Sequence, residues 1–450
     1  MVKQISWPLP QGKQDGPFKL ERMKQALQIL GEPQNKLKNV IHIAGTNGKG
    51  STMAFVEKIL LESGFSTCAY ISPSLIELNE RLRINSQNIS DELFLQNLTE
   101  VEDILKKNNI EKDLTFFEGL TATAFYTFAK IGADFNIIEV GLGGRFDATN
   151  VFSPANKLAN IITQISFDHT EYLGNTIEQI ATEKVQILTK GAINILSAQN
   201  YEGAQDVFCN QVKNLGEGGK GGYIYGHDFS CEKITNGFVV EGKHFEGEFI
   251  DLPRPSLLGS HQYFNASNAV FAAKMIANKL NLQDKITDAT IAAAIISTTW
   301  LARMQKVVSA QNYDIIVDGG HNEGSVLALC NFLQETFNDG LYKKINIIYG
   351  ALERKDVAKI AAKLTLYGIT NFIDKIYLTA INTYDKCHSP QYLQQIFAEN
   401  GLQNTQIIDN LPTFLTQINP HQKTLFLAYG SLYLCAEVIE ILSEGLPEGV

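Results

Sequence analysis

The fold of this 450-residue chain is decided by the stretch Asn39-Val-Ile-His-Ile-Ala-Gly-Thr-Asn-Gly-Lys-Gly-Ser51. Its first part, Asn39–Ala44, is apolar and β-branched, which predicts a buried strand. Apolar residues recur at helical spacing over Ser51–Ser63, and Gly64 follows as a stop signal, so we expect a helix there. A glycine-rich turn between a strand and a helix directs backbone N–H groups and the positive end of the helix dipole toward a phosphate chain. The stretch therefore predicts a phosphate-binding loop, and an accidental glycine-rich turn is the less favoured interpretation.

The side chains of this loop suit a nucleoside triphosphate and its metal ion. Glycines let the backbone approach the phosphates closely, and Lys49 can neutralise their β and γ oxygens. Ser51 is placed to bind Mg²⁺, although Gly50 separates it from Lys49, which departs from the common spacing of such loops. The candidate ATP-binding residues of the loop are Gly45, Thr46, Asn47, Gly48, Lys49, Gly50 and Ser51.

Further β-rich runs alternate with helical patterns along the chain. We expect strands at 65–72, 135–140, 160–165 and 192–197, and again at 314–318, 344–349, 375–378 and 424–429. Strands separated by helices predict βαβ units, and hence mainly parallel sheets covered by helices on both faces. The fold class is therefore α/β.

The chain is too long for one ordinary core, and its pattern predicts two domains. Residues 1–298 form the first, and residues 299–450 form a second, smaller α/β domain. The pattern loosens between about 203 and 253, where we expect a small antiparallel insertion. The glycine-rich run Gly216–Gly222 lies there without a buried strand before it, which favours a flexible loop. A helix is expected at Asp284–Ile296, with a linker beginning near Ser297.

Composition and charge exclude several classes of protein. Hydrophobic residues make up 44% and charged residues 19%, so the chain is neither disordered nor fibrous. Its net charge of -10 argues against sequence-independent binding of duplex nucleic acid. There is no apolar run long enough for a transmembrane helix and no apolar N-terminal signal segment, so we expect no membrane partner. The six cysteines are scattered without metal-binding spacing, as in reduced thiols of a cytoplasmic protein.

Three candidate residues lie at or beyond the ends of predicted strands. Glu139 falls in an apolar strand, where a carboxylate is costly unless it is paired or metal-bound; a structural salt bridge is the alternative. His169 follows Asp168 after the next strand, and a metal or phosphate role is about as well supported as a structural one. Lys184 lies in a predicted helix, and its local pattern favours a solvated surface position. Ligands commonly bind at the carboxyl ends of strands in open α/β sheets.

Three later segments carry weaker signals. His261–Ala266 places a histidine and amides at the start of an alanine-rich helix, and Asp318–Asn322 closes a predicted strand. Arg303 lies at the expected domain junction, from which a guanidinium could reach phosphates. Taken singly, each segment favours a surface or capping role.

Taken together and in order, these segments resemble the folylpolyglutamate synthase/dihydrofolate synthase family of Mur-type ATP-dependent ligases. The resemblance runs from about Phe18 to Leu442. Its most specific parts are His42–Thr52, Glu139–Arg145 with Asp147–Asn150, Asp168–Thr170 with Leu173-Gly174, and Gly430–Tyr433. It implies a Mur ligase-like fold, in which a central domain with a phosphate-binding loop precedes a smaller Rossmann-like domain and the active site lies between the two.

The resemblance also implies the reaction and its substrates. A pterin-linked carboxylate attacks the γ-phosphoryl of ATP to give an acyl phosphate, and the amino group of L-glutamate then displaces phosphate. Such a transfer depends on positioning and charge neutralisation more than on covalent help from the protein. Two Mg²⁺ positions are expected. The acceptors would be dihydropteroate and reduced folates, and we expect the chain to act as a monomer.

Residue by residue, the resemblance assigns a site. The family's Mg²⁺ ligands fall on Ser72, Glu139 and His169, to which the loop argument adds Ser51. ATP contacts fall on Gly48–Ser51, Asn265, Arg303 and Asp318. The pterin-binding segments fall on Thr115, Phe116, Phe117 and Glu118, and on Phe146, Asp147 and Ala148. The lysine that the family carbamylates falls on Lys184, which replaces the surface interpretation, and Lys49, His169 and Lys184 form the candidate catalytic set.

Three alternatives stay open at this point. The chain could catalyse only one of the two folate reactions. It could be a peptidoglycan-precursor Mur ligase, although the run from Glu139 to Asn150 and the Ser72 segment favour the folate branch. It could also be a nucleotide switch or binding module, but the Arg303 and Asp318 segments would then be unexplained.

Overall fold

A computed structural model describes residues 5–8, 19–216, 221–245, 247–384 and 386–445 of the chain. The chain divides into two compact units, which are described separately below. The first comprises Met1–Ser256 and Tyr263–Thr298, and the second comprises Leu257–Gln262 and Thr299–Val450. The expectations about the N-terminal segment and about the flexible loop at Gly216–Gly222 fall largely on residues 1–4, 9–18 and 217–220, which lie outside the described residues.

The first unit is built on a mixed, mainly parallel sheet, as the alternation of strands and helices predicts. Its strand order among the described residues is β4-β3-β2-β5-β1-β6-β7-β8. Every pair from β2 to β8 is parallel, whereas β3 and β4 form an antiparallel edge. The strands are β1 Val40–Ala44, β2 Thr67–Tyr70, β3 Leu82–Ile84, β4 Gln87–Asn88, β5 Phe135–Glu139, β6 Lys157–Ile162, β7 Ile193–Leu196 and β8 Gly222–Ile224.

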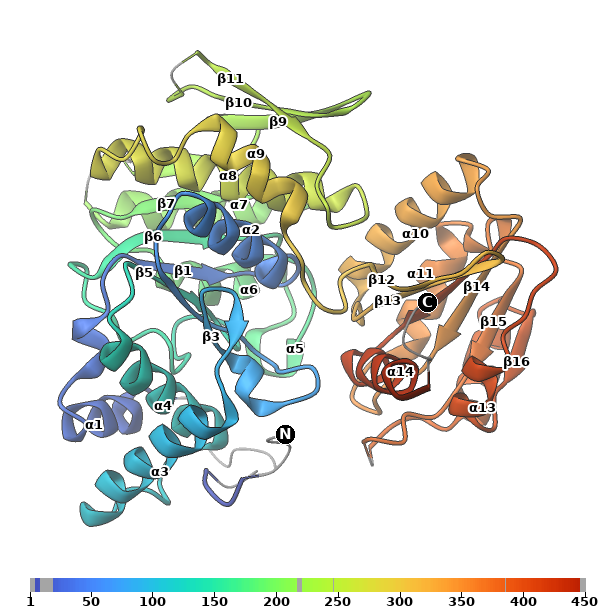
Figure 1. Ribbon diagram of the computed structural model, residues 1–450, viewed down its shortest axis with the longest axis horizontal. Helices are drawn as coiled ribbons and strands as arrows, with labels where there is room; N and C mark the ends of the chain where they lie inside the picture. Colours follow the sequence, from blue (N-terminus) through green and yellow to red (C-terminus); the bar gives the residue numbers. More distant parts are fainter. Residues whose placement is uncertain (1–4, 9–18, 217–220, 246, 385, 446–450) are drawn as a thin grey trace. The chain divides into compact units, whose positions relative to one another are not determined.

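Helices cover both faces of this sheet, as Figure 1 shows, with α2, α8 and α9 on one face and α1, α3, α4 and α6 on the other. On the second face α1, α3 and α4 bury one hydrophobic cluster against β2, while α6 and α7 bury another beside β6 and β7. The helices are α1 Glu21–Ile29, α2 Lys49–Glu62, α3 Asp91–Lys107, α4 Phe116–Ile131, α5 Thr170–Leu173, α6 Ile177–Lys184, α7 Glu202–Asn214, α8 His261–Leu280 and α9 Asp288–Ser297, with short 3₁₀ turns η1 Pro33–Lys36, η2 Leu78–Arg81 and η3 Val185–Ile187.

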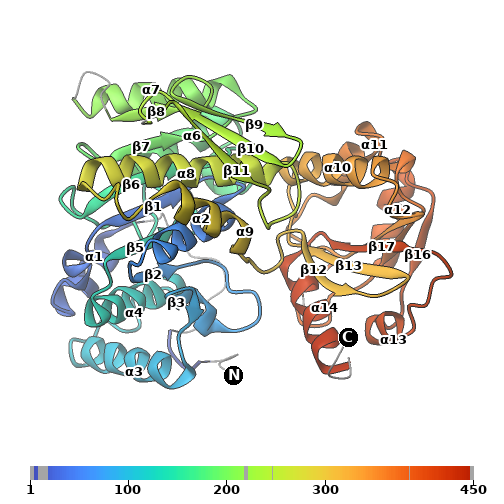
Figure 2. The same ribbon diagram turned by 45° about the horizontal axis from the view of Figure 1, so that its top comes forward.

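The expectation of an antiparallel insertion over the whole of 203–253 is corrected by the structure. Residues up to Asn214 form α7, and β8 joins the main sheet parallel to β7. Antiparallel pairing begins only with β9 Phe229–Ile234, which pairs with β10 Gly237–Gly242, and β10 pairs in turn with β11 Phe249–Pro253. This small sheet lies against α8 (Figures 1 and 2), where the rings of Phe229 and Phe271 stack at 4.2 Å.

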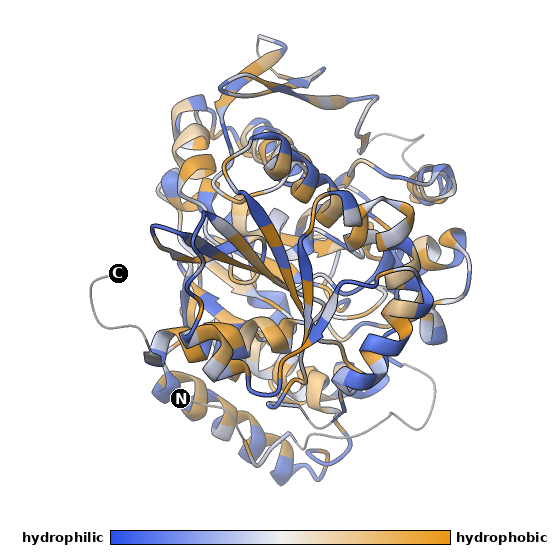
Figure 3. Ribbon diagram, turned by 90° about the vertical axis from the view of Figure 1, so that its right-hand side faces the viewer, coloured by the Kyte–Doolittle hydropathy of each residue, from blue (hydrophilic) through white to orange (hydrophobic). Residues whose placement is uncertain are grey.

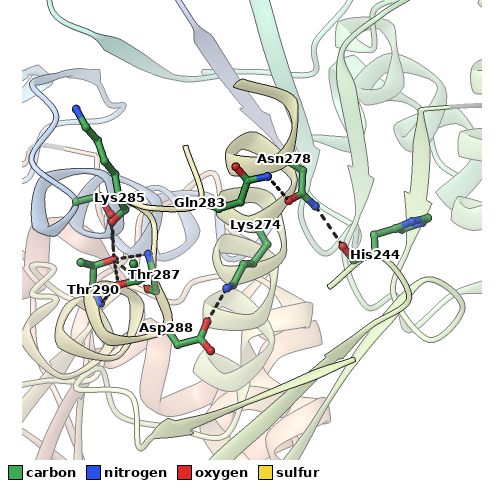
Figure 4. A network of polar contacts seen from close by, with 9 residues as sticks. His244, Lys274, Asn278, Gln283, Lys285, Thr287, Asp288 and Thr290 are labelled. Atoms are coloured by element: carbon green, nitrogen blue, oxygen red, sulfur yellow. Dashed lines mark hydrogen bonds and ion pairs between the residues drawn. The ribbon is translucent and has the colours of Figure 1, made fainter. Parts of the chain in front are cut away.

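Polar contacts on the outer side of α8 fix it against its neighbours (Figure 4). Lys274 donates a hydrogen bond to Asp288 at the start of α9. Asn278 Nδ2 donates to the carbonyl oxygen of His244, between β10 and β11, at 3.2 Å. These contacts join α8 to α9 and to the connection between β10 and β11.

The second unit is an open α/β sheet in the order β12-β13-β17-β14-β15-β16. Its strands run parallel except for β12, which is antiparallel to β13. Helices bury a continuous cluster against the sheet, and Figure 3 shows hydrophobic residues gathered on one side of the helices. The elements are β12 Gln305–Ser309, β13 Tyr313–Asp318, α10 Glu323–Asn338, β14 Lys344–Tyr349, α11 Val357–Leu366, η4 Ile369–Asn371, β15 Lys375–Leu378, α12 Pro390–Glu399, β16 Thr405–Ile407, α13 Leu411–Thr416, β17 Thr424–Tyr429 and α14 Leu432–Gly445.

None of the helices within the described ranges combines the length and apolar character needed to cross a lipid bilayer. The six cysteines are free thiols, and Cys68, Cys330 and Cys435 are buried.

Candidate active site

The loop between β1 and α2 has a backbone that only glycine can supply. Gly45 and Gly48 have φ values of 147° and 87°, which L side chains rarely adopt. A Cβ on Gly48 would lie 2.4 Å from Oδ1 of Asn265, and one on Gly45 would lie 1.9 Å from Oγ1 of Thr163. The N–H groups of Thr46 and Asn47 donate to the carbonyl oxygen at position 164. Residues far apart in the sequence therefore hold this loop.

Lys49, Glu139 and Ser72 come together at the carboxyl edge of the sheet. Nζ of Lys49 lies 3.9 Å from Oε1 of Glu139 and donates to the carbonyl oxygen of Thr46 at 3.3 Å. Ser72 donates its backbone N–H to Oε2 of Glu139 at 3.1 Å. The salt bridge considered for Glu139 thus exists, and its cation is the lysine of the phosphate-binding loop.

Ser72 also carries an unsatisfied polar atom. Its Oγ is buried and has no hydrogen-bond partner among the described residues. A buried hydroxyl without a partner is costly unless a ligand satisfies it. Because Glu139 is only 6% exposed, this oxygen and the neighbouring carboxylate form a small, largely buried, oxygen-rich site.

The other predicted metal ligands lie on nearby elements of the same unit. Ser51 is buried in the first turn of α2. His169 has a left-handed φ of 51° at the start of α5, and its N–H donates to the Asp168 carboxylate at 3.0 Å. No group of three or more His, Cys, Asp or Glu residues within the described ranges is arranged to hold a metal ion. The Mg²⁺ ligand set therefore stays a prediction.

Lys184 is buried, so the surface position that its local pattern favours is wrong. Its Nζ donates to the carbonyl oxygen of Gly45 at 3.0 Å, beneath the phosphate-binding loop. Burial and then the nearby Lys49 cation lower its pKa to about 7, while Asp168 and Asp147 act in the opposite direction. A substantial fraction of the Lys184 side chains is therefore a neutral amine near neutral pH.

The loop that follows β5 packs against the end of α6. A Cβ on Gly144 would lie 2.6 Å from the carbonyl oxygen of Glu183, and Arg145 Nε lies 3.3 Å from Oε1 of the same glutamate. Phe146 is 47% exposed and its ring lies beneath the Arg145 guanidinium, with 5.9 Å from Cζ to the ring centroid. Ala148 is buried. Of the predicted pterin-binding residues in this loop, Phe146 alone offers a large exposed surface.

Asp147 uses its carboxylate to shape the same loop. Its Oδ2 accepts the N–H of Leu142 at 2.8 Å, and its Oδ1 accepts the N–H of Thr149 at 3.0 Å. Burial raises the pKa of Asp147, and the hydrogen bonds from Thr149 and Leu142 oppose that change.

The predicted segment Thr115–Glu118 forms the start of α4. Thr115 and Glu118 cap the helix reciprocally, and Glu118 also pairs with Arg22 at 3.3 Å. The ring of Phe116 lies 5.6 Å from Cζ of Arg81. A Cβ on Gly141 would lie 2.5 Å from the ring of Phe117, so this segment contacts the loop after β5. The first predicted pterin-binding segment therefore lies against the loop that carries the second.

The remaining predicted ATP contacts divide between the two units. Asn265 lies on α8 in the first unit, where its Oδ1 is 3.5 Å from Oγ1 of Thr52. Arg303 and Asp318 belong to the second unit, at the carboxyl end of β13. Asp318 accepts the N–H of Met304 and that of the residue at 320, both at 2.9 Å. Its carboxylate therefore holds the backbone directly after Arg303 and the turn that follows β13.

Sequence reasoning missed several residues that build this site. Thr163 and Gln164 follow β6 directly and hold the phosphate-binding loop through the contacts given above. Both fall inside the strand expected at 160–165, which ends at Ile162 in the structure, so no signal in the sequence marked them. Lys157 was also missed, although a lysine at the start of an apolar strand is unusual; its Nζ donates to the carbonyl oxygen of Ile187 at 2.8 Å, and burial lowers its pKa to about 7.

Comparisons with known proteins identify the family to which the chain belongs. The Mur ligase middle domain model matches residues 43–275. A dihydrofolate synthase/folylpolyglutamate synthase from Bacillus subtilis is 35% identical over 77% of this chain and 78% of its own length. A dihydrofolate synthetase from Saccharomyces cerevisiae is 28% identical over 94% of this chain and 97% of its own. Among solved structures, Mycobacterium tuberculosis folylpolyglutamate synthase complexed with ADP and AMPPCP matches with a TM-score of 0.79 and 25% identity, covering 96% of each chain.

The fold and the phosphate-binding loop define the class of protein as a Mur-type ligase. Within that class, the chain belongs to the folylpolyglutamate synthase/dihydrofolate synthase family. The resemblance found in the sequence and the fold class that it implied are confirmed. Membership in a ligase family sets aside the nucleotide-switch alternative, and the folate relatives favour the folate branch over peptidoglycan synthesis.

Proposed function

We propose that this chain, an ATP-dependent folate–glutamate ligase by family, adds L-glutamate both to dihydropteroate and to reduced folates. The observation that carries the proposal is the meeting of Lys49, Glu139 and Ser72 at the carboxyl edge of β5 and β1. A phosphate-binding cation lies there beside a buried carboxylate and an unpaired hydroxyl. These are the groups needed to place a terminal phosphoryl group and its counterion.

In this proposal the phosphate-binding loop positions the triphosphate of ATP. The amides at the start of α2 and the Lys49 ammonium neutralise the charge on the phosphate oxygens. Asn265 borders the loop at Gly48 and supplies an amide beside the nucleotide. Arg303 and Asp318 are proposed as further ATP contacts from the second unit.

The residues present fit Mg²⁺. The unpartnered Ser72 Oγ and the Glu139 carboxylate are hard oxygen ligands of the kind that Mg²⁺ prefers. We propose that Ser72, Glu139 and His169, with Ser51 from the loop, would hold two Mg²⁺ ions. When bound, these ions would offset the negative charge that builds up during phosphoryl transfer.

Lys184 is the proposed site of a carbamate. Its buried, low-pKa amine supports this assignment, because only a neutral amine can take up carbon dioxide. The product would be an anion beneath the Gly45 carbonyl and could act as a metal ligand. Carbon-13 NMR after equilibration with labelled bicarbonate should show a carbamate resonance that is absent from Lys184→Met; identical spectra would exclude the modification.

The pterin side of the substrate is assigned to Thr115–Glu118, whose Phe117 lies against Gly141, and to Phe146–Ala148 in the same loop as Gly141. The exposed Phe146 ring could stack on a pterin, and the Phe117 ring beside Gly141 would border it. The carboxylates of Glu118 and Asp147 are engaged in capping and loop bonds, so we assign them to shaping the segments.

The test measures ADP release with ATP, Mg²⁺ and L-glutamate, using dihydropteroate and tetrahydrofolate as acceptors side by side. The proposal expects glutamate-dependent turnover with both acceptors. Turnover with only one of them would leave a monofunctional enzyme, and turnover without glutamate would contradict ligase activity. We also propose that the chain works as a cytoplasmic monomer, which light scattering and cell fractionation would check.

A further inference from the structure

A buried hydrogen-bonded chain connects the first strand of the site to the loop after β5. Nε2 of His42 lies 2.9 Å from Oγ1 of Thr149, and that hydroxyl donates to Oδ1 of Asp147. His42 and Thr149 are completely buried, and Asp147 is almost so. His42 lies on β1, and Thr149 lies 107 residues further along the sequence, so this network joins two distant segments.

The hydrogen-bonding capacity of each side chain determines which atom donates and which accepts in this network. The Asp147 carboxylate accepts from Thr149 and from Leu142, which is the pattern of an ionised acceptor. The single hydroxyl proton of Thr149 is therefore committed to Asp147, and Thr149 Oγ1 must accept its bond from His42. Burial, and then the Lys157 cation, lower the pKa of His42 well below its ordinary value, so the ring is neutral and its one proton is on Nε2. The other nitrogen, Nδ1, has no partner among the described residues.

This hydrogen-bonded network ends at Asp147, which holds both ends of the loop that follows β5. Through Leu142, Asp147 fixes the backbone next to Gly141, which touches Phe117. Through Thr149, it fixes the last turn before Asn150, whose Oδ1 accepts from Lys157 at 3.2 Å. The loop contacts assigned above to the pterin side thus depend on the orientation of one carboxylate.

We propose that His42 and Thr149 are positioning residues for the pterin-side substrate, because they lock Asp147 and with it the loop from Gly141 to Asn150. The inference rests on the proposed function and extends it to two residues that need not touch any substrate. It predicts that their loss weakens binding of the acceptor and leaves the nucleotide largely unaffected.

Two pairs of substitutions test this role. Thr149→Val keeps the shape of the side chain and removes the hydroxyl, whereas Thr149→Ser keeps the hydroxyl. His42→Gln places an amide nitrogen near the position of Nε2, whereas His42→Asn places one near Nδ1. We expect Thr149→Val and His42→Asn to raise the KM for dihydropteroate about tenfold, because each leaves a buried polar group without its partner, with the KM for ATP within about twofold of the wild type. Thr149→Ser and His42→Gln should stay near the wild-type values.

The outcomes are distinguishable. Equal acceptor KM values for Thr149→Val and the wild type, equal losses for acceptor and ATP, or failure of Thr149→Val to fold while Thr149→Ser folds would each overturn the inference. A wild-type chain that forms no glutamate conjugate would instead contradict the proposed function. In that case calorimetric titration with dihydropteroate still compares the variants, and equal affinities would overturn the positioning role.

Discussion

Replacement of Lys184 by methionine should change how the stability of the chain depends on pH. Lys184 is buried beneath the phosphate-binding loop, and its pKa is about 7 in the folded chain against an ordinary value near 10.5. Between these two values the unfolded chain binds the proton and the folded chain has lost it. The free energy of unfolding must therefore rise with pH in this window. Below pH 7 both states carry the proton, and this contribution becomes flat.

The size of the effect follows from the same pKa values. Inside this window the free energy of unfolding rises by up to about 1.4 kcal/mol for each pH unit, because one proton is involved. At pH 7 the folded chain is still half-protonated at Lys184, which makes the total rise slightly smaller. From pH 7 to pH 9, the wild type should gain about 2 kcal/mol relative to Lys184→Met. The low-pKa Lys157 is present in both proteins, so its contribution cancels.

Urea unfolding at pH 7, 8 and 9 measures this difference. Lys190→Met, which removes an exposed lysine six residues further along, controls for loss of a lysine as such. Parallel stability curves for the wild type and Lys184→Met would refute the reasoning, because they would mean that Lys184 titrates alike in both states. A carbamate that persists in the purified protein would also flatten the difference, and the carbon-13 spectrum identifies that case.

Three further predictions follow from contacts in the two units. Lys49→Ala should lower kcat about a hundredfold or more, because a preorganised cation is lost; phosphate release measures this, and near wild-type turnover would contradict it. Gly48→Ala should weaken ATP binding at least about tenfold in calorimetry, because its Cβ would meet Asn265 and its φ of 87° suits glycine; unchanged affinity would mean that the loop adapts. Asp314→Asn should cost about 3 kcal/mol at pH 7, because Asp314 is a buried ion-pair acceptor that also binds Tyr342. Burial alone would raise the pKa of Asp314, but its hydrogen bonds to lysines hold that pKa well below the ordinary range. The stability that Asp314 contributes should therefore be lost only as the pH falls below about 4. If the stability difference between the wild type and Asp314→Asn does not shrink in acid, this ion pair does not have the expected role.

The buried strands were the most predictable part of the fold. The runs at 344–349, 375–378 and 424–429 are apolar and β-branched, and the structure has strands with these same limits. The runs at 344–349 and 424–429 are almost wholly buried in a parallel sheet, so their composition alone identifies them. The edge strands β12 and β16 were missed because their polar residues resemble those of loops.

Other features depend on contacts that no local pattern contains. Lys184 has the sequence environment of a surface lysine, and it is buried only because the segment from Gly144 to Arg145 packs over the end of α6. The approach of Asn265 to Gly48 joins residues more than two hundred positions apart, and only the family resemblance suggested it. The helix α7 was missed because the glycine-rich run that follows it dominated the interpretation of that region.

The proposed reaction requires that ATP activate the carboxylate of the acceptor, and transfer of oxygen-18 into phosphate reports on that step. Dihydropteroate labelled in both carboxylate oxygens is incubated with ATP, Mg²⁺, L-glutamate and the purified chain, and the products are weighed by mass spectrometry. An acyl phosphate predicts one labelled oxygen in each phosphate released and the other in the new amide. Formation of the glutamate conjugate together with unlabelled phosphate, or release of phosphate with no conjugate at all, would contradict the proposed reaction.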